Sequence, residues 1–396
     1  MRAGADNKTL KTGAREWLRG DRTIWVLFFL FTAISLVSVY SSIGRSAIED
    51  FGTTPTRAFL RHFFIVVATY ITVIVVARFN YTYFSRISYY LFLICIALLG
   101  YLLATHGQRW LQVPVIGQIQ PSEIAKIVLI VYTARQLVTR RENIESLETF
   151  LRVLWPTVLV SALVFAENFS TAALIFLSTY ITMYFGGVNK RYWWRLFAIL
   201  VVATVGFLFY LSIHNNTSDF MRSETWGARV ERWMHNDPDQ LTQENMARMA
   251  IARGKVVGVG IGNTVFARLM TQANNDFIYA IILEEVGIIG GILVLLLYSI
   301  FFLRCVIIAS HCSHRFGMMI AIGMGTVIYI QALINMCVSV GVLPVTGQTL
   351  PLISSGGTAY LFLGVAVGVI QSVAHSNQQE QATTTAATQT TDPLTQ

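Results

Sequence analysis

The chain has 396 residues, of which 54% are hydrophobic and only 13% charged, and its mean hydropathy is +0.57. Soluble domains carry about a quarter charged residues, so this composition excludes an ordinary soluble domain and indicates an integral membrane protein. The net charge of +8 is mostly a topology signal, and the basic residues of the predicted cytoplasmic connections are scattered singly over short turns, a pattern that does not indicate nucleic-acid binding.

Ten apolar segments are long enough to cross a bilayer as helices, because about 20 apolar residues span the hydrocarbon. Only helices satisfy the backbone of such segments in lipid, so the sequence predicts an all-α polytopic membrane protein. A polar arm, residues 1–22, precedes a transmembrane domain, residues 23–375, and a polar tail, residues 376–396, is predicted to be disordered. The predicted spans are residues 23–42, 59–78, 87–104, 121–139, 151–166, 170–187, 192–213, 277–303, 317–340 and 357–374.

The basic residues of the connections predict the orientation. Six of them precede the first span, and the short connections after each even-numbered crossing are also rich in arginine and lysine. Because cytoplasmic loops carry this excess, both ends of the chain are predicted to lie in the cytoplasm. The long loop 214–275, between the seventh and eighth spans, and the loop 341–356 are then both outside.

The stretch 108–126 leads into the fourth span. Pro121 suits the first turn of a helix, and Glu123 favours its positive end. Glu123 and Lys126 are three residues apart and share a face. This pattern allows two interpretations, a self-neutralising pair at the interface or a pair that lines a site together with Arg109.

The segment 167–171 and the long loop also allow two interpretations each. Asn and Ser at 167–171 predict either a helix cap or a substrate contact. In the long loop, residues 240–253 predict a surface helix, with Met246, Met249 and Ala250 on one face. Several cations lie next to the glycine-rich run 254–262 and could bind either a pyrophosphate or anionic lipid headgroups: Arg229, Arg232, Arg248, Arg253 and Lys255.

Asp276 ends the long loop where the chain re-enters an apolar span. An acid at the lip of a bilayer costs free energy unless it faces water or a partner, so Asp276 is a candidate general base. The alternative is a helix N-cap. On a helix Glu284 would lie near the face of Asp276 and Glu285 would point elsewhere, and capping alone does not explain these two deeper acids.

The ninth span and the loop after it complete the pattern. Gln331 and Asn335 inside the span are typical of interhelical hydrogen bonds. The loop 341–357, which contains Thr346 and Ser354, has the glycine and proline content of a re-entrant segment. Irregular backbone at membrane depth is tolerated where it lines a cavity, so the loop predicts a pocket near the outer face.

These motifs resemble the FtsW/RodA family, also called SEDS proteins. The matching pieces are I-Q-P-S-E-I-A-K at 119–126, the glycine run 254–262, N-D-F-I-Y-A-I-I-L-E-E-V-G at 275–287 and G-V-L-P-V-T-G-Q-T-L-P-L-I-S-S-G-G at 341–357. Departures from the family pattern are Asn168, Ser170 and Lys255, and the segment before Asp276. The polar N-terminal arm and the segment 167–170 favour the division branch over the elongation branch.

The resemblance implies a ten-helix peptidoglycan glycosyltransferase of the bacterial inner membrane that polymerises lipid II on the outer face. It implies Asp276 as the catalytic base and undecaprenyl pyrophosphate as the leaving group, with a divalent cation, Mg²⁺ or Mn²⁺, left open and Asp276 as its candidate ligand. Its implied partners are a class B penicillin-binding transpeptidase and other membrane proteins of the division or elongation machinery. Candidate substrate and pyrophosphate contacts are Arg109, Glu123, Lys126, Arg253, Lys255, Thr346 and Ser354, supported by Glu284, Glu285, Gln331 and Asn335.

Two other functions are compatible with the same residues. A flippase or transporter for lipid II would also need cavity-lining charges and an external loop. The chain shows no duplicated half-repeats with broken helices, which weakens a conventional secondary transporter. A division scaffold without chemistry of its own is the third alternative.

Overall fold

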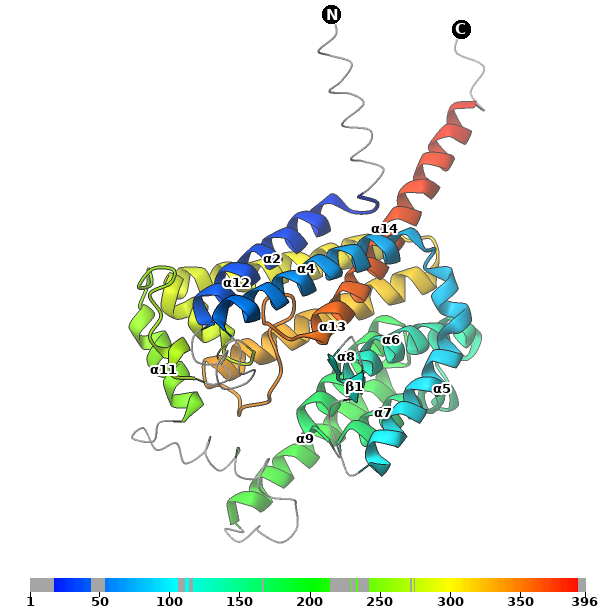
Figure 1. The fold of residues 1–396 in the computed structure, drawn as a ribbon. Coiled ribbons are helices and arrows are strands. Elements are labelled where there is room, and N and C mark those ends of the chain that lie inside the picture. Colours follow the sequence, from blue (N-terminus) through cyan, green and yellow to red (C-terminus); the bar gives the residue numbers. More distant parts are fainter. Residues whose placement is uncertain are drawn as a thin grey trace, which may run out of the picture.

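The structure is a computed structural model that describes residues 18–43, 54–105, 111–113, 117–165, 167–213, 229, 233, 242–270, 273 and 275–390. It is almost entirely helical, and a long helix lies over each of the ten predicted spans (Figure 1). These helices are α2 Arg22–Ser42, α4 Pro55–Arg78, α5 Thr82–Ala104, α6 Pro121–Thr139, α7 Leu147–Phe165, α8 Phe169–Phe185, α9 Lys190–Ile213, α12 Ile278–Ser310, α13 Arg315–Ser339 and α14 Thr358–Thr390.

Shorter elements fill the connections. They are the strands β1 Leu111–Val113 and β2 Gly117–Ile119, the helix α11 Gln243–Gly254, and the 3-10 turns η1 Arg141–Asn143 and η2 Phe266–Arg268. The two strands form an antiparallel hairpin in which Gln112 faces Gln118. Sequence reasoning did not predict this hairpin. Thr358 at the start of α14 donates a hydrogen bond to Gln118 O (2.8 Å), which ties the hairpin to the helix bundle.

The helices form two groups joined by α13. In Figure 1, α2, α4, α12 and α14 lie together, and α5 to α9 form the second group. Helix α13 contacts α12 and α14 on one side and α6 and α8 on the other. Most of its residues are buried, including the amide side chains of Gln331 and Asn335. Helix α13 is therefore the central element of the fold.

By length and composition, seven described helices could cross a membrane: α2, α4, α5, α7, α12, α13 and residues 358–383 of α14. Helix α8 is apolar but shorter. The outer helices expose large apolar side chains, for example Phe64 (65%), Ile94 (63%) and Val202 (71%). Apolar patches of this extent are rare on soluble monomers and fit a surface that faces lipid.

Two predictions about the loop helix and the tail differ from the structure. The predicted helix at 240–253 is present as α11, but its buried face carries Ala247, Ala250 and Gly254, while Met249 is exposed. This small-residue face packs closely on α12, and a position along the membrane surface stays a prediction. The tail predicted as disordered from residue 376 instead continues α14 as helix to Thr390, because extending an established helix does not carry the cost of nucleation.

Candidate functional site

The loop 340–357 between α13 and α14 is irregular yet largely buried. Its backbone carbonyls are hydrogen-bonded by side chains of the surrounding helices. Ser35 Oγ donates to Ile353 O (2.7 Å), Tyr360 OH donates to Leu352 O (2.9 Å), and Tyr298 OH donates to Pro351 O. Leu352 itself has a positive φ of 59°, which is costly for a non-glycine residue and is maintained by this packing. The prediction of a folded-back segment in this loop thus matches the structure.

This loop clamps the backbone just before α12. Asn335 Nδ2 donates to Asp276 O (2.8 Å) and to Gln348 O (2.7 Å). Ser354 Oγ donates to Asn275 O (2.6 Å), and Ser355 Oγ donates to Asn275 Oδ1 (2.9 Å). Side chains far apart in sequence therefore fix the position of Asp276 through its main chain.

In contrast, no described residue donates a hydrogen bond to the Asp276 carboxylate. The alternative of an N-cap is wrong, because α12 begins at Ile278 after Phe277 and no side chain caps it. Asp276 is partly exposed. Burial by surrounding protein atoms raises its pKa to about 6, and the positive charge of Arg229 opposes the rise. The result is a positioned carboxylate that titrates near neutral pH, as a general base requires.

Two arginines of the long loop lie against the 340–357 loop. Arg229 Nη1 donates to Val345 O (3.3 Å). Arg248 packs its guanidinium on Gly341, where an added Cβ would lie 2.8 Å from Nε. Trp233 Nε1 also donates to Gly341 O (3.0 Å). The cations that the structure brings to this loop are thus Arg229 and Arg248, which the sequence did not rank above the other basic residues.

Arg253 has a different position from the one expected for a pyrophosphate contact. Its Nη1 pairs with Glu284 Oε1 (2.5 Å) and donates to Asn263 O (3.2 Å). Glu284 is fully buried and also accepts from Thr264 Oγ1 (2.5 Å) and Val265 N (3.0 Å). The expectation that Glu284 shares a helix face with Asp276 is wrong, because Asp276 precedes the helix. Glu284 instead fastens the loop to α12.

Glu285 fastens the other side of the same loop. It accepts from Gly262 N (2.9 Å) and from Ser41 Oγ at the end of α2. Lys255 is exposed and has a positive φ of 49°. Of the two basic residues predicted beside the glycine run, Lys255 is the one with an exposed ammonium group and Arg253 is the one engaged by an acid.

The glycine run docks onto a break in α12 and does not form an open anion cradle. Gly287 has φ 73°, which interrupts the helix. Ile288 N and Ile289 N donate to Lys255 O (3.1 Å) and Val256 O (3.4 Å) instead of to their own helix, and the freed carbonyls of Glu284 and Glu285 accept from Val259 N and Gly260 N. At Gly258 (φ 87°) an added Cβ would lie 2.1 Å from Glu285 O, so only glycine fits. The sequence did not predict this exchange of hydrogen bonds between α12 and residues 255–260. Its sequence signal is the glycine-containing stretch V-G-I-I-G-G at 286–291.

Glu123 and Lys126 form a buried pair at the start of α6. Lys126 Nζ is 2.8 Å from Glu123 Oε2 and donates to Gln331 Oε1 (2.8 Å). Gln331 Nε2 in turn donates to Thr349 O (3.0 Å). The geometry favours the self-neutralising interpretation, with the pair linked through Gln331 to the 340–357 loop. Arg109, the third member of the predicted group, lies outside the described residues.

Thr346 and Asn168 complete the predicted contacts. Thr346 lies in the same loop next to Gly347, whose added Cβ would be 3.7 Å from Asp276 Oδ2. Its hydroxyl is buried and has no hydrogen-bond partner among the described residues. Asn168 Oδ1 accepts from Ser170 N (3.0 Å) and Thr171 N (3.3 Å), so the capping interpretation of segment 167–171 is confirmed.

Few side chains near Asp276 could act as ligands of a divalent cation. Among the described residues, no three His, Cys, Asp or Glu side chains come together as a ligand set. Mg²⁺ is commonly held by one or two carboxylates together with substrate phosphates and water. The single carboxylate of Asp276 fits a cation shared with a pyrophosphate and does not fit a closed protein cage.

Asn335→Ala is expected to lower the turnover number of the reaction in which Asp276 acts as the base about tenfold or more. The KM for the substrate of that reaction should not change to a matching extent. Asn335 acts through the Asp276 main chain, and a carbonyl left unsatisfied costs about 1–3 kcal/mol. The matched control is Asn377→Ala on α14, where a buried amide donates to Ile308 O (2.9 Å) far along the bundle. Equal losses of turnover in the two variants would show that Asn335 has only a structural role.

Comparison with known protein families and structures places these residues in context. A family model described as "Cell cycle protein" (FtsW, RodA, SpoVE) matches residues 21–379. The chain is 32% identical over 270 residues to "Probable peptidoglycan glycosyltransferase FtsW" of Nitrosococcus halophilus, covering 67% of each chain. It is 30% identical over 373 residues to the protein of the same name in Coxiella burnetii, covering 90% of this chain and 97% of that one.

Solved structures share the fold. A chain from the structure described as "Structural coordination of polymerization and crosslinking by a peptidoglycan synthase complex" superposes with a TM-score of 0.72 at 20% identity, covering 92% of this chain and all of that one. The rod shape determining protein RodA of Thermus thermophilus superposes with a TM-score of 0.64 at 19% identity, covering 92% and 99%. At these identities the likeness concerns the fold.

Proposed function

Because the chain belongs to the FtsW/RodA/SpoVE family of cell cycle proteins, we propose that it is a peptidoglycan glycosyltransferase that polymerises lipid II into glycan strands. Relatives that carry this activity in their names match most of the chain. The proposal rests on one observation above all. The Asp276 backbone is clamped by Asn335, while its carboxylate accepts no described hydrogen bond and has a pKa of about 6.

In the proposed reaction, Asp276 takes the proton from the 4-hydroxyl of the acceptor sugar. The resulting oxygen attacks the anomeric carbon of the donor chain, a new glycosidic bond forms, and the bond to undecaprenyl pyrophosphate breaks. Deprotonation by a positioned base contributes roughly 10²–10⁴ in rate. The electron pair of the broken bond leaves with the pyrophosphate, so stabilisation of that anion is the second requirement.

Arg229, Arg248 and Lys255 are the proposed contacts of the pyrophosphate. Arg229 and Arg248 lie against the 340–357 loop, and Lys255 is exposed. Thr346 offers its unpartnered hydroxyl to the substrate. A divalent cation, Mg²⁺ or Mn²⁺, would be held by Asp276 and the substrate phosphates and would neutralise charge on the leaving group. Arg253, Lys126, Glu123 and Ser354 hold the surrounding segments in place.

The proposed topology has ten crossings of the bacterial inner membrane, with both termini in the cytoplasm and Asp276 at the outer face. The positive-inside pattern supports this orientation. The proposed partner is a class B penicillin-binding transpeptidase, since a chain of the same fold was solved in a complex that combines polymerisation and crosslinking. The relatives named FtsW favour action in cell division.

The decisive experiment supplies purified protein with lipid II, with and without the transpeptidase and with and without a chelator. Polymerised glycan strands are the expected product. Movement of lipid II across a vesicle membrane without any polymer would favour the flippase alternative. Absence of both under all four conditions, from a well-folded sample, would favour a scaffold without chemistry.

The rate of polymerisation is expected to rise with pH and to be half-maximal near pH 6. The base must be ionised, and burial raises the pKa of Asp276 to about 6, so protonation removes activity as the pH falls through that value. Arg229→Gln removes the cation that holds this pKa down, so the midpoint should move to higher pH. Arg248→Gln, an identical charge change, is the control and should leave the midpoint in place. A profile that is flat from pH 5 to pH 8 would contradict the assignment of Asp276 as the base.

A further inference from the structure

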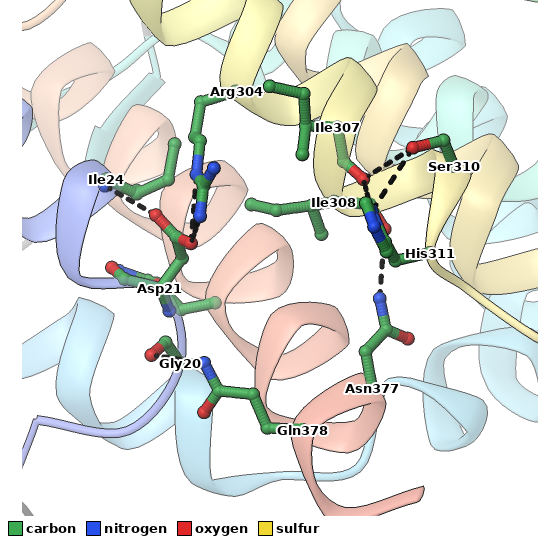
Figure 2. A network of polar contacts seen from close by, with 11 residues as sticks. Gly20, Asp21, Ile24, Arg304, Ile307, Ile308, Ser310, His311, Asn377 and Gln378 are labelled. Atoms are coloured by element: carbon green, nitrogen blue, oxygen red, sulfur yellow. Dashed lines mark hydrogen bonds and ion pairs between the residues drawn. The ribbon is translucent and has the colours of Figure 1, made fainter. Parts of the chain in front are cut away.

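A second polar centre lies near the far end of α12, where the start of α2 and the middle of α14 meet it (Figure 2). A cavity of about 730 Å³ opens there, lined by Arg19, Asp21, Arg22, Arg304, His375 and Gln378, among others. This volume is within the range of sites for small molecules, roughly 300–1,000 Å³. The cavity is separate from Asp276, which precedes the first residue of α12.

The walls of this cavity are built by specific contacts. Asp21 N donates to Gln371 Oε1 (2.7 Å), and Gln371 Nε2 donates to Asp21 O (3.1 Å). Gln378 Nε2 donates to Gly20 O (3.2 Å), as Figure 2 shows for the two labelled residues. Gly20 has φ 96°, and an added Cβ would lie 2.4 Å from Gln371 Oε1. The segment before α2 is thus held firmly against α14, which preserves the shape of the cavity.

The charge of the lining is unbalanced. Arg304 donates to Asp21 Oδ2 through Nε (3.0 Å) and Nη2 (2.6 Å), and Ile24 N donates to Oδ1 (3.1 Å), so the one acid among the described lining residues is already engaged. The side chains of Arg19 and Arg22 are exposed. No carboxylate of a described residue forms an ion pair with either of them. The guanidinium groups of Arg19 and Arg22 therefore remain to bind an anion at the cavity, whereas Arg304 is already paired with Asp21.

The position of the cavity indicates where its anion comes from. It lies at the first residues of the first apolar helix, on the side that the basic connections assign to the cytoplasm. That leaflet carries anionic lipids, and basic pockets between helices on this side bind phosphate-bearing headgroups. Planar guanidinium groups match phosphate oxygens with paired hydrogen bonds. We propose that this cavity binds a phosphate group, supplied by the headgroup of an anionic membrane lipid.

The experiment compares lipid retention by the full chain purified in detergent, measured by native mass spectrometry. The probes are phosphatidylglycerol, phosphatidylcholine and inorganic phosphate. The test variant is Arg19→Gln/Arg22→Gln, and the control is Arg140→Gln/Arg141→Gln, which removes the same charge from another connection on the same side. Each basic residue near a charged lipid surface contributes roughly fivefold in affinity, so the test variant should lose about 25-fold for phosphatidylglycerol.

A second variant guards against loss of fold. Gln379→Glu adds an acid to the cavity lining and removes no hydrogen bond of the described residues. It should reduce retention of phosphatidylglycerol about fivefold and leave the gel-filtration profile unchanged. The control variant should stay within about twofold of the parent protein.

Other outcomes decide the source of the phosphate or reject the site. Displacement of phosphatidylglycerol by millimolar inorganic phosphate, in the parent protein only, would support the phosphate chemistry of the cavity. Binding of inorganic phosphate without any preference for phosphatidylglycerol over phosphatidylcholine would reject the lipid as its source. Equal losses in the test and control variants would overturn the proposal as a whole. None of these results depends on whether the protein polymerises lipid II.

Discussion

Asp276→Asn is expected to abolish glycan polymerisation, with a loss of at least 10²–10⁴ in rate. The amide has nearly the shape of the carboxylate but cannot accept the proton of the sugar hydroxyl. The main-chain hydrogen bond from Asn335 to residue 276 does not depend on the side chain and should persist. Formation of glycan strands from lipid II measures the effect directly.

The same substitution is expected to raise the thermal midpoint slightly at pH 7. The pKa of Asp276 is about 6 in the folded protein against 3.8 for the free group, so ionisation is easier in the unfolded chain. The resulting loss of stability develops as the pH rises from 3.8 to about 6 and is complete at pH 7. Glu244→Gln in α11 is the matched control, an acid-to-amide change in the same long loop. Polymerisation by the Asp276 variant within tenfold of the parent rate would show that another group is the base.

Gly258→Ala is expected to destabilise the protein by about 2–5 kcal/mol, because it combines a positive φ with overpacking against backbone. The added Cβ would lie 2.1 Å from Glu285 O, and a carbonyl of the main chain cannot rotate away as a side chain can. The loop 254–262 would then separate from α12. Thermal unfolding in detergent and polymerisation should both be affected.

Gly262→Ala is the control for that prediction. Gly262 also has a positive φ, 85°, but an added Cβ would meet nothing within 4 Å. Only the cost of the backbone conformation remains, about 1–2 kcal/mol. Its N–H still donates to Glu285 Oε1 (2.9 Å). Equal destabilisation by the two alanines would show that the close approach at Gly258 contributes nothing.

The helices were predictable from sequence because their signal is strong and local. Each of these signals affects only neighbouring residues in the sequence. Examples are apolar runs of about 20 residues, Pro121 at a helix start and Asn168 as a helix cap. The end of α14 was not predictable, because a polar tail gives no apolar signal. Its helix is supported by contacts such as Asn377 to Ile308 O, which come from another part of the chain.

The catalytic candidate could be selected from sequence, but its surroundings could not. Asp276 is conspicuous as an acid at the edge of an apolar run. The cation that acts on Asp276 is Arg229, and long-range packing decides this, so spacing could not separate Arg229 from Arg253 and Lys255. The buried partner of Arg253 is Glu284, 31 positions away, and only the folded chain shows that this pair is already satisfied.

The break at Gly287 has a mechanical consequence. Two amides and two carbonyls that would normally bond along α12 are instead exchanged with residues 255–260. The nine residues before the break therefore share their rigidity with the glycine loop and are only weakly joined to the rest of α12. A protein that contacts residues 255–260 would therefore act first on the segment 278–286, while Asn335 and Ser354 hold the main chain of residues 275 and 276 in place.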